Sequence, residues 1–421
     1  MDSKLQIPIS NLQRNTKAQT PKRRGATSAF GFWNLKFLWD LAFGVWSFPP
    51  RLAAPACALL GLFLCLAATA TSSLAADLTR FEFTRPAMGM PFRVTLYARD
   101  RATADAAADA AFKRIKELNA ILSDYEPDSE LSQLSKTSGS SQTVPLSPTL
   151  WTVLSRAQEL SRRSSGAFDV TVGPCVWLWR KARLVRKLPD PAALAEAMKA
   201  VGWQKLVLDP KKRAAKLLAP NMRLDLGAIA KGYAADEALA ALRKHGITRA
   251  LVVGGGDMAL GDPPPGKAGW RIAVASLAEN GLGSPFYGPN TGEVERTSKS
   301  VPGTSSRFVI ASRCGLATSG DLFQHVEIDG KRYSHIVDPR TGIGLTDHSL
   351  AVVIARDGIT ADGLSTTASV LGPQAGLKLI EATPGAEVFI ARKPANKTET
   401  FESKGFRRYW EKPANSRTSA P

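Results

Sequence analysis

The hydrophobic pattern of this chain changes its period once, and that change limits the fold more than any other feature. As far as Gly246, apolar residues recur at helical spacing over four segments. Beyond Gly246 they gather in short, β-branched runs separated by Gly, Asp and Pro. Helices and antiparallel strands without regular βαβ alternation favour an α+β fold, with mixed, largely antiparallel sheets and flanking helices.

The predicted elements follow from this pattern. An opening strand covers residues 92–98, and Asp225 precedes the fourth helix as its predicted N-cap. The predicted helices are residues 103–122, 147–161, 192–201, 226–244, 361–371 and 373–383. The predicted strands of the second half are residues 250–253, 270–274, 307–311, 325–328, 333–337, 350–355 and 387–391, with a tight hairpin at Asp329-Gly330.

A charge-free apolar run lies before all of these elements. It covers residues 52–76, follows Arg51, and ends with Ser73-Leu74-Ala75, which places small residues at the −3 and −1 positions of a cleavage site. A buried core helix is the alternative, but about 25 residues without a charge behind a basic arm favour export. We predict that residues 1–76 are a basic n-region plus a signal peptide or membrane anchor. The protein is then periplasmic, and an uncleaved segment would anchor it in the inner membrane.

The remaining boundaries are set by composition. Residues 77–395 are predicted to form one large domain, interrupted by a flexible Gly/Ser/Pro/Asn-rich loop insertion at 277–305. Residues 396–421 are predicted to be the C-terminal end of the domain and a polar tail. Beyond residue 76 only Cys175 and Cys314 remain, and the sequence leaves open whether they form a disulfide.

The formal net charge of +18 raises nucleic acid and anionic membrane surfaces as partners. Residues 1–76 hold eight basic and two acidic side chains, so a third of that net charge belongs to the targeting segment. The rest is spread without a dense Lys/Arg run or a nucleic-acid-binding motif. We therefore expect no nucleic-acid partner.

Two glycine-containing segments are candidates for phosphate binding. In Asp225-Leu-Gly-Ala-Ile-Ala-Lys231-Gly-Tyr, the amides and positive dipole end of a helix start favour an anion, and Lys231 lies two turns in. An ordinary N-cap with a solvated lysine is the alternative. Val253-Gly-Gly-Gly-Asp257 follows a predicted strand, and its glycines permit close approach by a ligand or merely by another strand.

Two further segments carry groups suited to proton transfer and metal binding. His335, one of only four histidines, lies between a predicted strand and the turn Asp338-Pro-Arg-Thr-Gly. It is either a general base or a structural partner of Asp338. On a helix, Asp362 and Thr366 lie one above the other with Ser365 adjacent, which suits Mg²⁺ shared with substrate phosphates. Capping by Asp362 at the helix start is the alternative.

In their order and their residues, these segments resemble the motifs of the FAD:protein FMN transferase (ApbE) family. The resemblance also covers Met88-Gly89, Tyr125-Glu-Pro-Asp-Ser129 and Gly166-Ala-Phe-Asp169. It extends to the neighbourhood of Gly405-Phe406, and its most specific parts are Asp-Leu-Gly-Ala-Ile-Ala-Lys-Gly-Tyr and His-Ile-Val-Asp-Pro-Arg-Thr-Gly. The resemblance implies a single large ApbE-like domain behind the N-terminal signal or anchor segment.

The resemblance also implies roles for individual residues. The FAD contacts would be Met88, Tyr125, Ala167, Phe168, Asp169, Asp225, Lys231 and Ile336. The Mg²⁺ ligands would be Ala228, through its backbone carbonyl, with Asp362, Ser365 and Thr366. The catalytic residues would be His335 as the base, Asp362 and Lys231. Tyr125 and Phe168 offer rings that could stack on the flavin or the adenine.

Similar proteins move FMN from FAD to a Thr or Ser hydroxyl of an acceptor flavoprotein and release AMP. The expected partner is a subunit of an exported or membrane electron-transport complex. With water as the acceptor, the same site is an FAD pyrophosphatase. A non-enzymatic exported flavin-binding or assembly protein would not need Asp362, Thr366 and His335 together, and a membrane-tethered structural protein would need none of the site residues. Self-flavinylation at Asp362-Gly-Leu-Ser-Thr-Thr367 is a weaker interpretation than metal binding by the same residues.

Overall fold

The computed structural model describes residues 78–275, 277, 307–322, 324–394 and 397–412. The predicted targeting segment, almost all of the 277–305 insertion and the end of the polar tail lie outside these residues. Within the described part of the chain, no helix combines the length and apolarity that a membrane span requires.

The described helices and strands have the following bounds. The α-helices are α3 (Arg101–Leu122), α4 (Glu130–Lys136), α5 (Pro148–Arg163), α6 (Gly173–Val185), α7 (Pro191–Lys199), α8 (Ala230–Lys244) and α9 (Gly358–Glu381), and the short 3-10 helices are η1 (Val170–Val172), η2 (Trp203–Lys205) and η4 (Phe406–Tyr409). The strands are β1 (Thr79–Ala87), β2 (Met90–Ala98), β3 (Val144–Pro145), β4 (Leu206–Asp209), β5 (Ala214–Leu217), β6 (Ala250–Gly254), β7 (Asp257–Leu260), β8 (Trp270–Val274), β9 (Arg307–Ala311), β10 (Cys314–Gly320), β11 (His325–Ile328), β12 (Lys331–Ser334), β13 (Val337–Asp338), β14 (Ile343–Gly344), β15 (Ser349–Ala355), β16 (Glu387–Arg392) and β17 (Glu399–Glu402).

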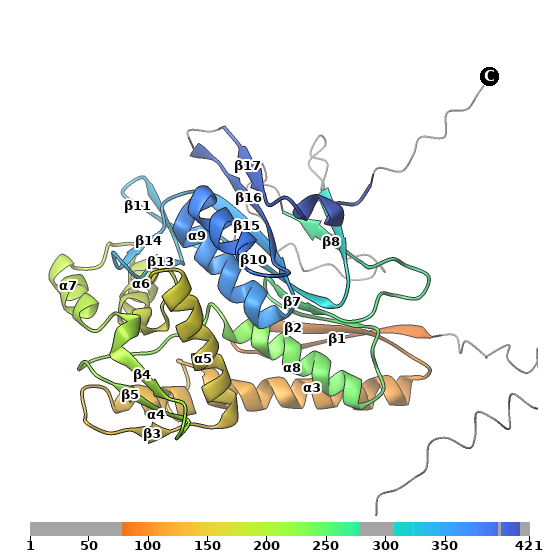
Figure 1. The fold of residues 1–421 in the computed structure, drawn as a ribbon, viewed down its shortest axis with the longest axis horizontal. Coiled ribbons are helices and arrows are strands. Elements are labelled where there is room, and N and C mark those ends of the chain that lie inside the picture. Colours follow the sequence, from red (N-terminus) through yellow and green to blue (C-terminus); the bar gives the residue numbers. More distant parts are fainter. Residues whose placement is uncertain (1–77, 276, 278–306, 323, 395–396, 413–421) are drawn as a thin grey trace, which may run out of the picture. The chain divides into compact units, whose positions relative to one another are not determined.

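A central sheet of eight strands organises the domain (Figure 1). Its order is β1-β2-β6-β7-β10-β15-β16-β17, and every neighbouring pair is antiparallel. Four smaller sheets surround it, formed by β3-β5-β4, β8-β9, β11-β12 and β13-β14. The prediction of an α+β fold with largely antiparallel sheets is therefore confirmed.

The two faces of the central sheet bury alternate residues of its inner strands. In β15, Ala351 and Val353 pack on the face covered by α3, α8 and α9, which lie together in Figure 1. Leu350 and Val352 point to the opposite face, which the β8-β9 ribbon and η4 cover. Because successive side chains of a strand point to opposite faces, two covering layers require strands that are apolar throughout, as β15 is.

Several local predictions hold and others are wrong. The helices predicted at 147–161 and 192–201 are present as α5 and α7, capped by Ser147 and Asp190, with Pro at the first turn of each helix. The predicted opening strand at 92–98 is preceded by β1, and Met88-Gly89 is the hairpin turn that joins β1 to β2. The predicted strand at 387–391 is present as β16, and a further strand that was not predicted, β17, pairs with it at the edge of the sheet.

The structure also answers whether Cys175 and Cys314 form a disulfide. Cys175 is buried beside Trp179 in a small apolar cluster, whereas Cys314 begins β10, and both thiols are free. Burial raises the pKa of Cys175 to about 11 and that of Cys314 to about 12, so both are protonated at neutral pH.

Helices α8 and α9 cross at two glycines. A Cβ atom at Gly232 would lie 2.1 Å from the carbonyl oxygen of Gly358, and one at Gly358 would lie 2.6 Å from that of Gly232. The two backbones can approach this closely only because neither residue has a side chain. The helix break predicted between residues 371 and 373 is present as a kink, with Gly372 at φ 75° before Pro373. The crossing brings the first turns of α9 against the start of α8.

Candidate active site

Three charged side chains meet at the helix crossing. Lys231 is the second residue of α8, Asp257 begins β7, and Asp362 lies in the second turn of α9. The Lys231 Nζ is 2.5 Å from Asp257 Oδ2 and 3.6 Å from Asp362 Oδ2. The two carboxylate side chains are only 4% and 1% exposed. We refer to these three residues as the buried cluster, in which one ammonium group faces two carboxylates.

Burial shifts the proton affinity of each member of the buried cluster. It raises the pKa of Asp362 to about 7, and repulsion from Asp257 acts in the same direction. Burial also raises the pKa of Asp257, against the attraction of Lys231. For Lys231 burial alone would lower the pKa, but attraction to the two carboxylates outweighs it and the pKa is raised. A further cation beside Asp362 would favour the ionised carboxylate.

The start of α8 differs from the prediction. The helix begins at Ala230 rather than 226, so Asp225 is not its N-cap, and the actual N-cap Ile229 forms no side-chain hydrogen bond. The Asp225 Oδ1 instead accepts from the Gly227 amide at 2.7 Å, which closes a turn before the helix. The helix does not begin at Asp225 because an aspartate side chain readily bonds to the backbone amide two residues on, which forms a turn instead.

One backbone amide at the start of α8 donates its hydrogen bond to a residue of another helix. The Gly232 amide donates to Asp362 Oδ2 at 3.0 Å, so Asp362 caps α8 from outside, rather than its own helix, which Asp357 caps. In a regular helix that amide would bond to the carbonyl four residues earlier. Among the described residues, nothing donates a hydrogen bond to the Ala228 carbonyl oxygen as a result. The Ala228 oxygen is left as a free acceptor near Asp362.

Three hydroxyl groups lie close together next to this cluster. The Ser319 Oγ, on β10, is 2.7 Å from Ser365 Oγ and 3.1 Å from Thr366 Oγ1. The Ser365 hydroxyl also donates to the Asp362 carbonyl at 2.9 Å. Thr366 and Asp362 therefore share the face of α9 that their spacing predicted.

These donors fit a magnesium ion better than a transition metal. Within the described residues, no three His, Cys, Asp or Glu side chains gather as a metal site. The available donors are the Asp362 carboxylate, the free Ala228 carbonyl and the Ser365 and Thr366 hydroxyls, all of them hard oxygen atoms. Mg²⁺ commonly takes one or two carboxylates and completes its shell with substrate phosphates and water.

His335 lies between β12 and β13, in a state suited to accepting a proton. Its Nδ1 is 3.1 Å from the Gln324 carbonyl oxygen, which also accepts from the His335 amide. A carbonyl only accepts, so Nδ1 carries the hydrogen and Nε2 keeps its lone pair. Burial lowers the pKa of His335 to about 4, and repulsion from Arg183 and Lys231 adds to this, so the ring is neutral at pH 7.

The alternative role of His335 receives no support from these contacts. The Asp338 carboxylate does not pair with His335. It forms two hydrogen bonds with the Arg340 guanidinium, at 2.9 and 2.8 Å. The turn after the histidine is therefore held by an arginine within the turn itself.

A buried aspartate supports the segment that orients His335. Asp321 is 2% exposed, and its Oδ1 accepts from His348 Nδ1 at 2.8 Å and from the Ser349 amide at 3.0 Å. The Arg332 guanidinium binds both the Asp321 carboxylate and its carbonyl oxygen. These contacts fix the chain just before Gln324, and thereby the carbonyl that selects the His335 tautomer.

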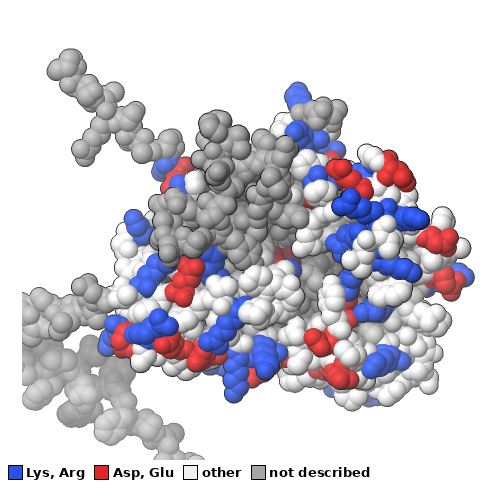
Figure 2. Space-filling view, turned by 180° about the vertical axis from the view of Figure 1, so that it is seen from behind, with Lys and Arg blue, Asp and Glu red and all other residues white. Residues whose placement is uncertain are grey.

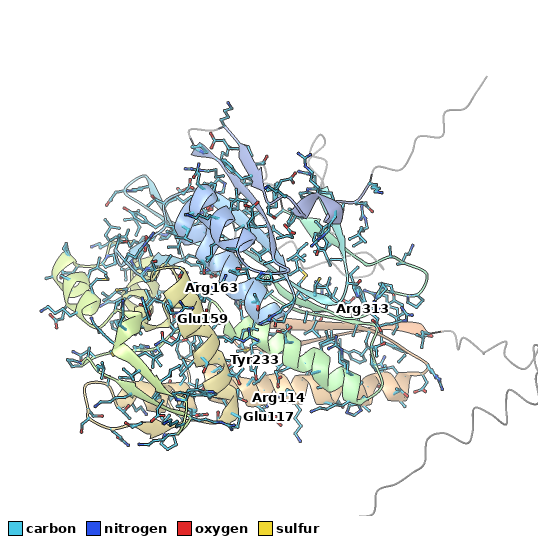
Figure 3. All side chains as sticks on the ribbon, viewed as in Figure 1. Arg114, Glu117, Glu159, Arg163, Tyr233 and Arg313 are labelled. Atoms are coloured by element: carbon cyan, nitrogen blue, oxygen red, sulfur yellow. The ribbon has the colours of Figure 1, made fainter. Side chains whose placement is uncertain are left out.

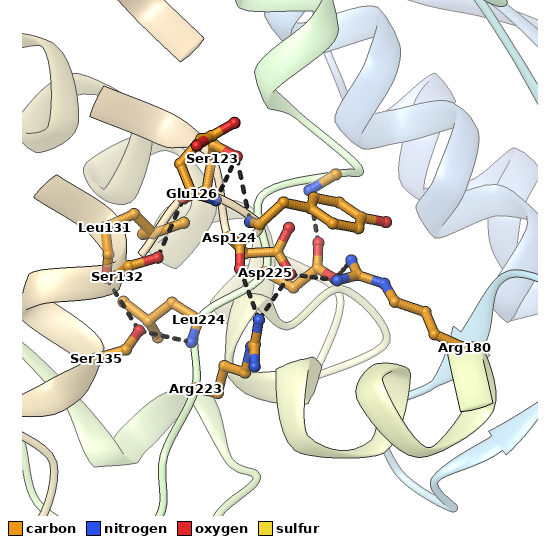
Figure 4. A network of polar contacts seen from close by, with 12 residues as sticks. Ser123, Asp124, Glu126, Leu131, Ser132, Ser135, Arg180, Arg223, Leu224 and Asp225 are labelled. Carbon is orange, nitrogen blue, oxygen red and sulfur yellow. Dashed lines mark hydrogen bonds and ion pairs between the residues drawn. The ribbon is translucent and has the colours of Figure 1, made fainter. Parts of the chain in front are cut away.

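A second group of charges surrounds Asp225 (Figure 4). Arg180 binds Asp124 Oδ2 at 2.5 Å through one guanidinium nitrogen and Asp225 Oδ2 at 2.8 Å through the other. The Arg223 guanidinium donates to the Asp124 carbonyl at 2.6 Å and lies 3.7 Å from its carboxylate. We call Asp124, Asp225, Arg180 and Arg223 the rim cluster. Burial raises the pKa of Asp225, and repulsion from Asp124 adds to it.

Tyr125 is attached to the rim cluster by its ring. The Arg180 Cζ lies 4.1 Å from the centroid of the ring, within cation–π range, yet 72% of the residue is exposed. An exposed ring on a charged support is an available stacking surface for a planar ligand. The structure thus joins two predicted FAD contacts, Tyr125 and Asp225, through Arg180.

The other predicted FAD contacts fall into two sets. Ala167 and Ile336 lie in one small apolar cluster, although they are far apart in the sequence. Phe168 is 3% exposed and its ring belongs to the main core, so it is not available for stacking. The Asp169 carboxylate is buried and accepts from the Thr171 amide and hydroxyl, at 2.8 and 2.7 Å. Ligand contacts by these last two residues would have to involve backbone atoms.

Met88 is placed by strand register alone. It has φ 49° in the β1-β2 turn, and β2 pairs with β6 so that Phe92 is opposite Gly254. The turn that follows Gly254 leads directly to Asp257. Met88 therefore lies at the end of the sheet that carries the buried cluster.

Sequence reasoning did not select several residues that the structure brings into these sites, among them Asp124, Arg180, Arg223, Asp257 and Ser319. Asp257 ends the segment Val253-Gly-Gly-Gly-Asp257, and Ser319 lies in the polar segment Ala-Thr-Ser-Gly-Asp321. Both could therefore have been chosen as candidates from the sequence. Arg180 offered no such signal, because it lies on α6, a helix that was not predicted.

Comparisons with known proteins agree with this fold. The flavin transferase ApbE from Vibrio cholerae superposes with a TM-score of 0.65 at 26% identity, over 79% of this chain and 100% of that one. The Pseudomonas stutzeri flavinyl transferase ApbE, in its apo form, gives a TM-score of 0.65 at 27% identity, over 79% and 97% of the two chains. The class of protein is therefore that of the flavin transferases.

The sequence comparisons identify the family. The ApbE family model matches residues 88–390. A Haemophilus influenzae protein named FAD:protein FMN transferase is 34% identical over 284 residues, which cover 66% of this chain and 76% of that one. One of the same name from Treponema pallidum is 32% identical over 313 residues, or 72% and 82% of the two chains. This chain belongs to the ApbE family.

Proposed function

We propose that this protein transfers FMN from FAD to a Thr or Ser hydroxyl of an acceptor flavoprotein, in a Mg²⁺-dependent reaction that releases AMP. The observation that carries the proposal is the buried cluster at the start of α8, with hydroxyl groups on one side and a neutral histidine nearby. The names of the relatives support the same activity.

The charges of the site suit a pyrophosphate. Lys231 favours an anion through its ammonium group and its place in the first turn of α8, although the amides of Ala230, Gly232 and Tyr233 in that turn are already hydrogen-bonded. Asp362, Ser365, Thr366 and the Ala228 carbonyl would hold Mg²⁺, which supplies positive charge to the phosphate oxygens when bound. The residues of this chain thereby stabilise the negative charge that develops on the bridging oxygen as it leaves with AMP.

His335 would handle the proton of the acceptor. The acceptor oxygen forms a bond to the phosphorus of FMN, the bond from that phosphorus to the bridging oxygen breaks, and the hydroxyl proton passes to His335 Nε2. A neutral imidazole with a low pKa is a weak base, so the proton moves as the new bond forms, when the hydroxyl has become acidic. The Gln324 carbonyl holds the ring in the required tautomer.

The rim cluster would bind the flavin or adenine part of FAD. Tyr125 offers its exposed ring face, and Arg180 and Asp225 fix the orientation of that ring and of the preceding turn. Ala167 and Ile336 pack together in a buried apolar cluster, and Ile336 directly follows His335. The same site with water in place of the acceptor is an FAD pyrophosphatase.

We further propose that residues 1–76 direct export to the periplasm, where they are either cleaved or retained as an inner-membrane anchor. The charge-free run at residues 52–76 supports this. The catalytic domain would then be residues 77–395, followed by the C-terminal end of the domain and the polar tail. The acceptor would be an exported or membrane subunit of an electron-transport complex.

The test combines the full chain with FAD, Mg²⁺ and membranes that contain candidate acceptors. Covalent transfer is read as in-gel flavin fluorescence of an acceptor band after denaturation, and AMP release is measured in parallel. Transfer predicts both signals in a fixed ratio, and both should be abolished by EDTA. AMP without a fluorescent band would establish the pyrophosphatase instead.

A further inference from the structure

A cavity of about 290 Å³ lies apart from the groups described above. It is a hollow, partly open to solvent, between α5, α8, the beginning of β10 and the turn between β15 and α9. Figure 3 shows two of its lining residues, Tyr233 beside α8 and Arg313 on the strand side. None of the proposed FAD, metal or catalytic residues lines it. The proposed function therefore leaves this cavity without a role.

Four arginines from four separate elements line the cavity, namely Arg156, Arg243, Arg313 and Arg356. Arg313 donates to Asp262 at 2.6 Å, and Arg356 donates to the adjacent Asp357 at 3.2 Å. Arg156 on α5 and Arg243 on α8 have no hydrogen-bond or ion-pair partner among the described residues. Two exposed arginines thus line the same hollow without a partner among the residues that the structure describes.

Carboxylates neutralise these arginines only in part: Asp357 pairs with Arg356, and Asp262, outside the lining, pairs with Arg313. Asp236 accepts from the amides of Gly358 and Ile359, at 2.7 and 2.9 Å, and so caps the start of α9. Asp357 accepts from the Thr360 amide at 3.0 Å. Four arginines against two carboxylates leave the lining with a net charge of +2.

The rest of the lining is largely apolar or aromatic, with Thr152 and Cys314 as its other members. Leu239, Leu260 and Ile359 are buried there, beside the Tyr233 ring. On the face of the molecule shown in Figure 2, by contrast, basic and acidic side chains lie interspersed. Guanidinium groups converging over an apolar floor are suited to a planar group that carries phosphate, since arginine matches phosphate geometry with paired donors.

We propose that this cavity binds a small phosphate-bearing anion, up to the size of a mononucleotide, at a second site separate from the FAD site. The unpaired guanidinium groups of Arg156 and Arg243 bind the phosphate, and Arg313 and Arg356 add positive charge at the edge. The binding needs neither Mg²⁺ nor Asp362. It therefore does not depend on the proposed transferase activity.

The test measures binding of pyrophosphate and of AMP to the full chain by calorimetry, in EDTA, at physiological salt and with saturating FAD. The test variant is Arg156→Gln/Arg243→Gln. The matched control is Lys211→Gln/Lys212→Gln, which removes two exposed charges from the β4-β5 turn. We expect saturable binding with one ligand per chain, weakened at least tenfold in the test variant and unchanged in the control, because each lost charge-assisted bond contributes roughly tenfold.

The two probes separate a plain phosphate site from a nucleotide site. Equal binding of both supports a site for phosphate alone, and tighter binding of AMP supports a site that also contacts the base. Equal weakening in test and control variants would mean attraction to net charge only, and would overturn the proposal. Absence of saturable binding would overturn it too. If FAD itself fails to bind, pyrophosphate and AMP titrations without FAD still compare the test and control variants. Failure of the proposed transferase function can thus be distinguished from failure of the proposed second site.

Discussion

The buried cluster and the rim cluster each combine two carboxylates with basic side chains, but their charge balance differs. At the rim, Asp124 and Asp225 face Arg180 and Arg223, so the formal charges cancel. In the buried cluster, Asp257 and Asp362 share Lys231 alone, which leaves one negative charge in excess. Burial, together with repulsion from Asp257, raises the pKa of Asp362 to about 7.

This difference separates a site built to position a ligand from one built to receive a cation. A charge-balanced group that is mostly buried keeps its geometry without a further ion, and the Tyr125 ring packs on it. An unbalanced buried pair is costly until another positive charge arrives. We therefore assign binding to the rim cluster, and chemistry to the buried cluster with His335. The predictions below test that division.

Replacement of His335 has the largest expected effect. The His335→Ala variant should transfer FMN roughly 10²–10⁴-fold more slowly in a single turnover, because it lacks the group that accepts the proton. Its FAD dissociation constant and melting temperature should change little. The control is His245→Ala, at the exposed C-terminal end of α8. Transfer at the wild-type rate under saturating FAD would remove His335 from the chemistry.

Replacement of Asp362 should remove the response to metal. Asp362→Asn keeps an acceptor for the Gly232 amide but loses the excess negative charge, so transfer should fall by roughly 10²–10³-fold. The fold should persist, since Lys231 remains paired with Asp257. Mg²⁺ should raise the melting temperature of the wild type but not of the variant. The control is Asp190→Asn at the exposed cap of α7. Equal Mg²⁺ titrations of wild type and Asp362→Asn would contradict the metal assignment.

The pH dependence distinguishes Asp362 from His335. Mg²⁺ binding requires ionised Asp362, whose pKa is about 7, so apparent Mg²⁺ affinity should fall about tenfold per pH unit below 7. His335 has a pKa of about 4 and stays neutral throughout, so the rate at saturating Mg²⁺ should be flat from pH 5 to 8. Without metal, the raised pKa of Asp362 stabilises the fold at low pH, and that contribution is lost as pH rises towards 7. Melting curves and Mg²⁺ titrations at several pH values test both statements.

The rim cluster should affect binding and not rate. Asp225→Asn removes one charged partner of Arg180 and loosens the support of Tyr125, so the FAD dissociation constant should rise roughly tenfold. The single-turnover rate at saturating FAD should stay close to that of the wild type. Asp109→Asn, which breaks the exposed pair with Arg85, serves as the control. A reduced rate with unchanged FAD affinity would reverse the assignment of the two clusters.

The sequence predicted the arrangement of site residues better where they lie on one helix than where they come from different helices and strands. Asp362 and Thr366 share a helix face whose geometry follows from spacing alone. The cap of α8 could not be predicted, because Asp362 comes from another helix and reaches Gly232 only through the glycine crossing. Strand β10 was missed because its Gly, Thr and Ser residues have little strand propensity, and it is stabilised by strands on both sides.

The smallest effect is expected from removal of residues 1–76. Both clusters, His335 and the central sheet lie within the described residues from 78 onwards, and their contacts are formed among those residues. The shortened chain should therefore keep the wild-type melting temperature, FAD affinity and transfer rate towards a soluble acceptor. Only the fraction of protein that is recovered with the membranes should change, because the apolar run at 52–76 is predicted to target or anchor the chain. A shortened chain that aggregates or unfolds without cooperativity would show that this run contributes to the core, and the boundary at residue 76 would be wrong.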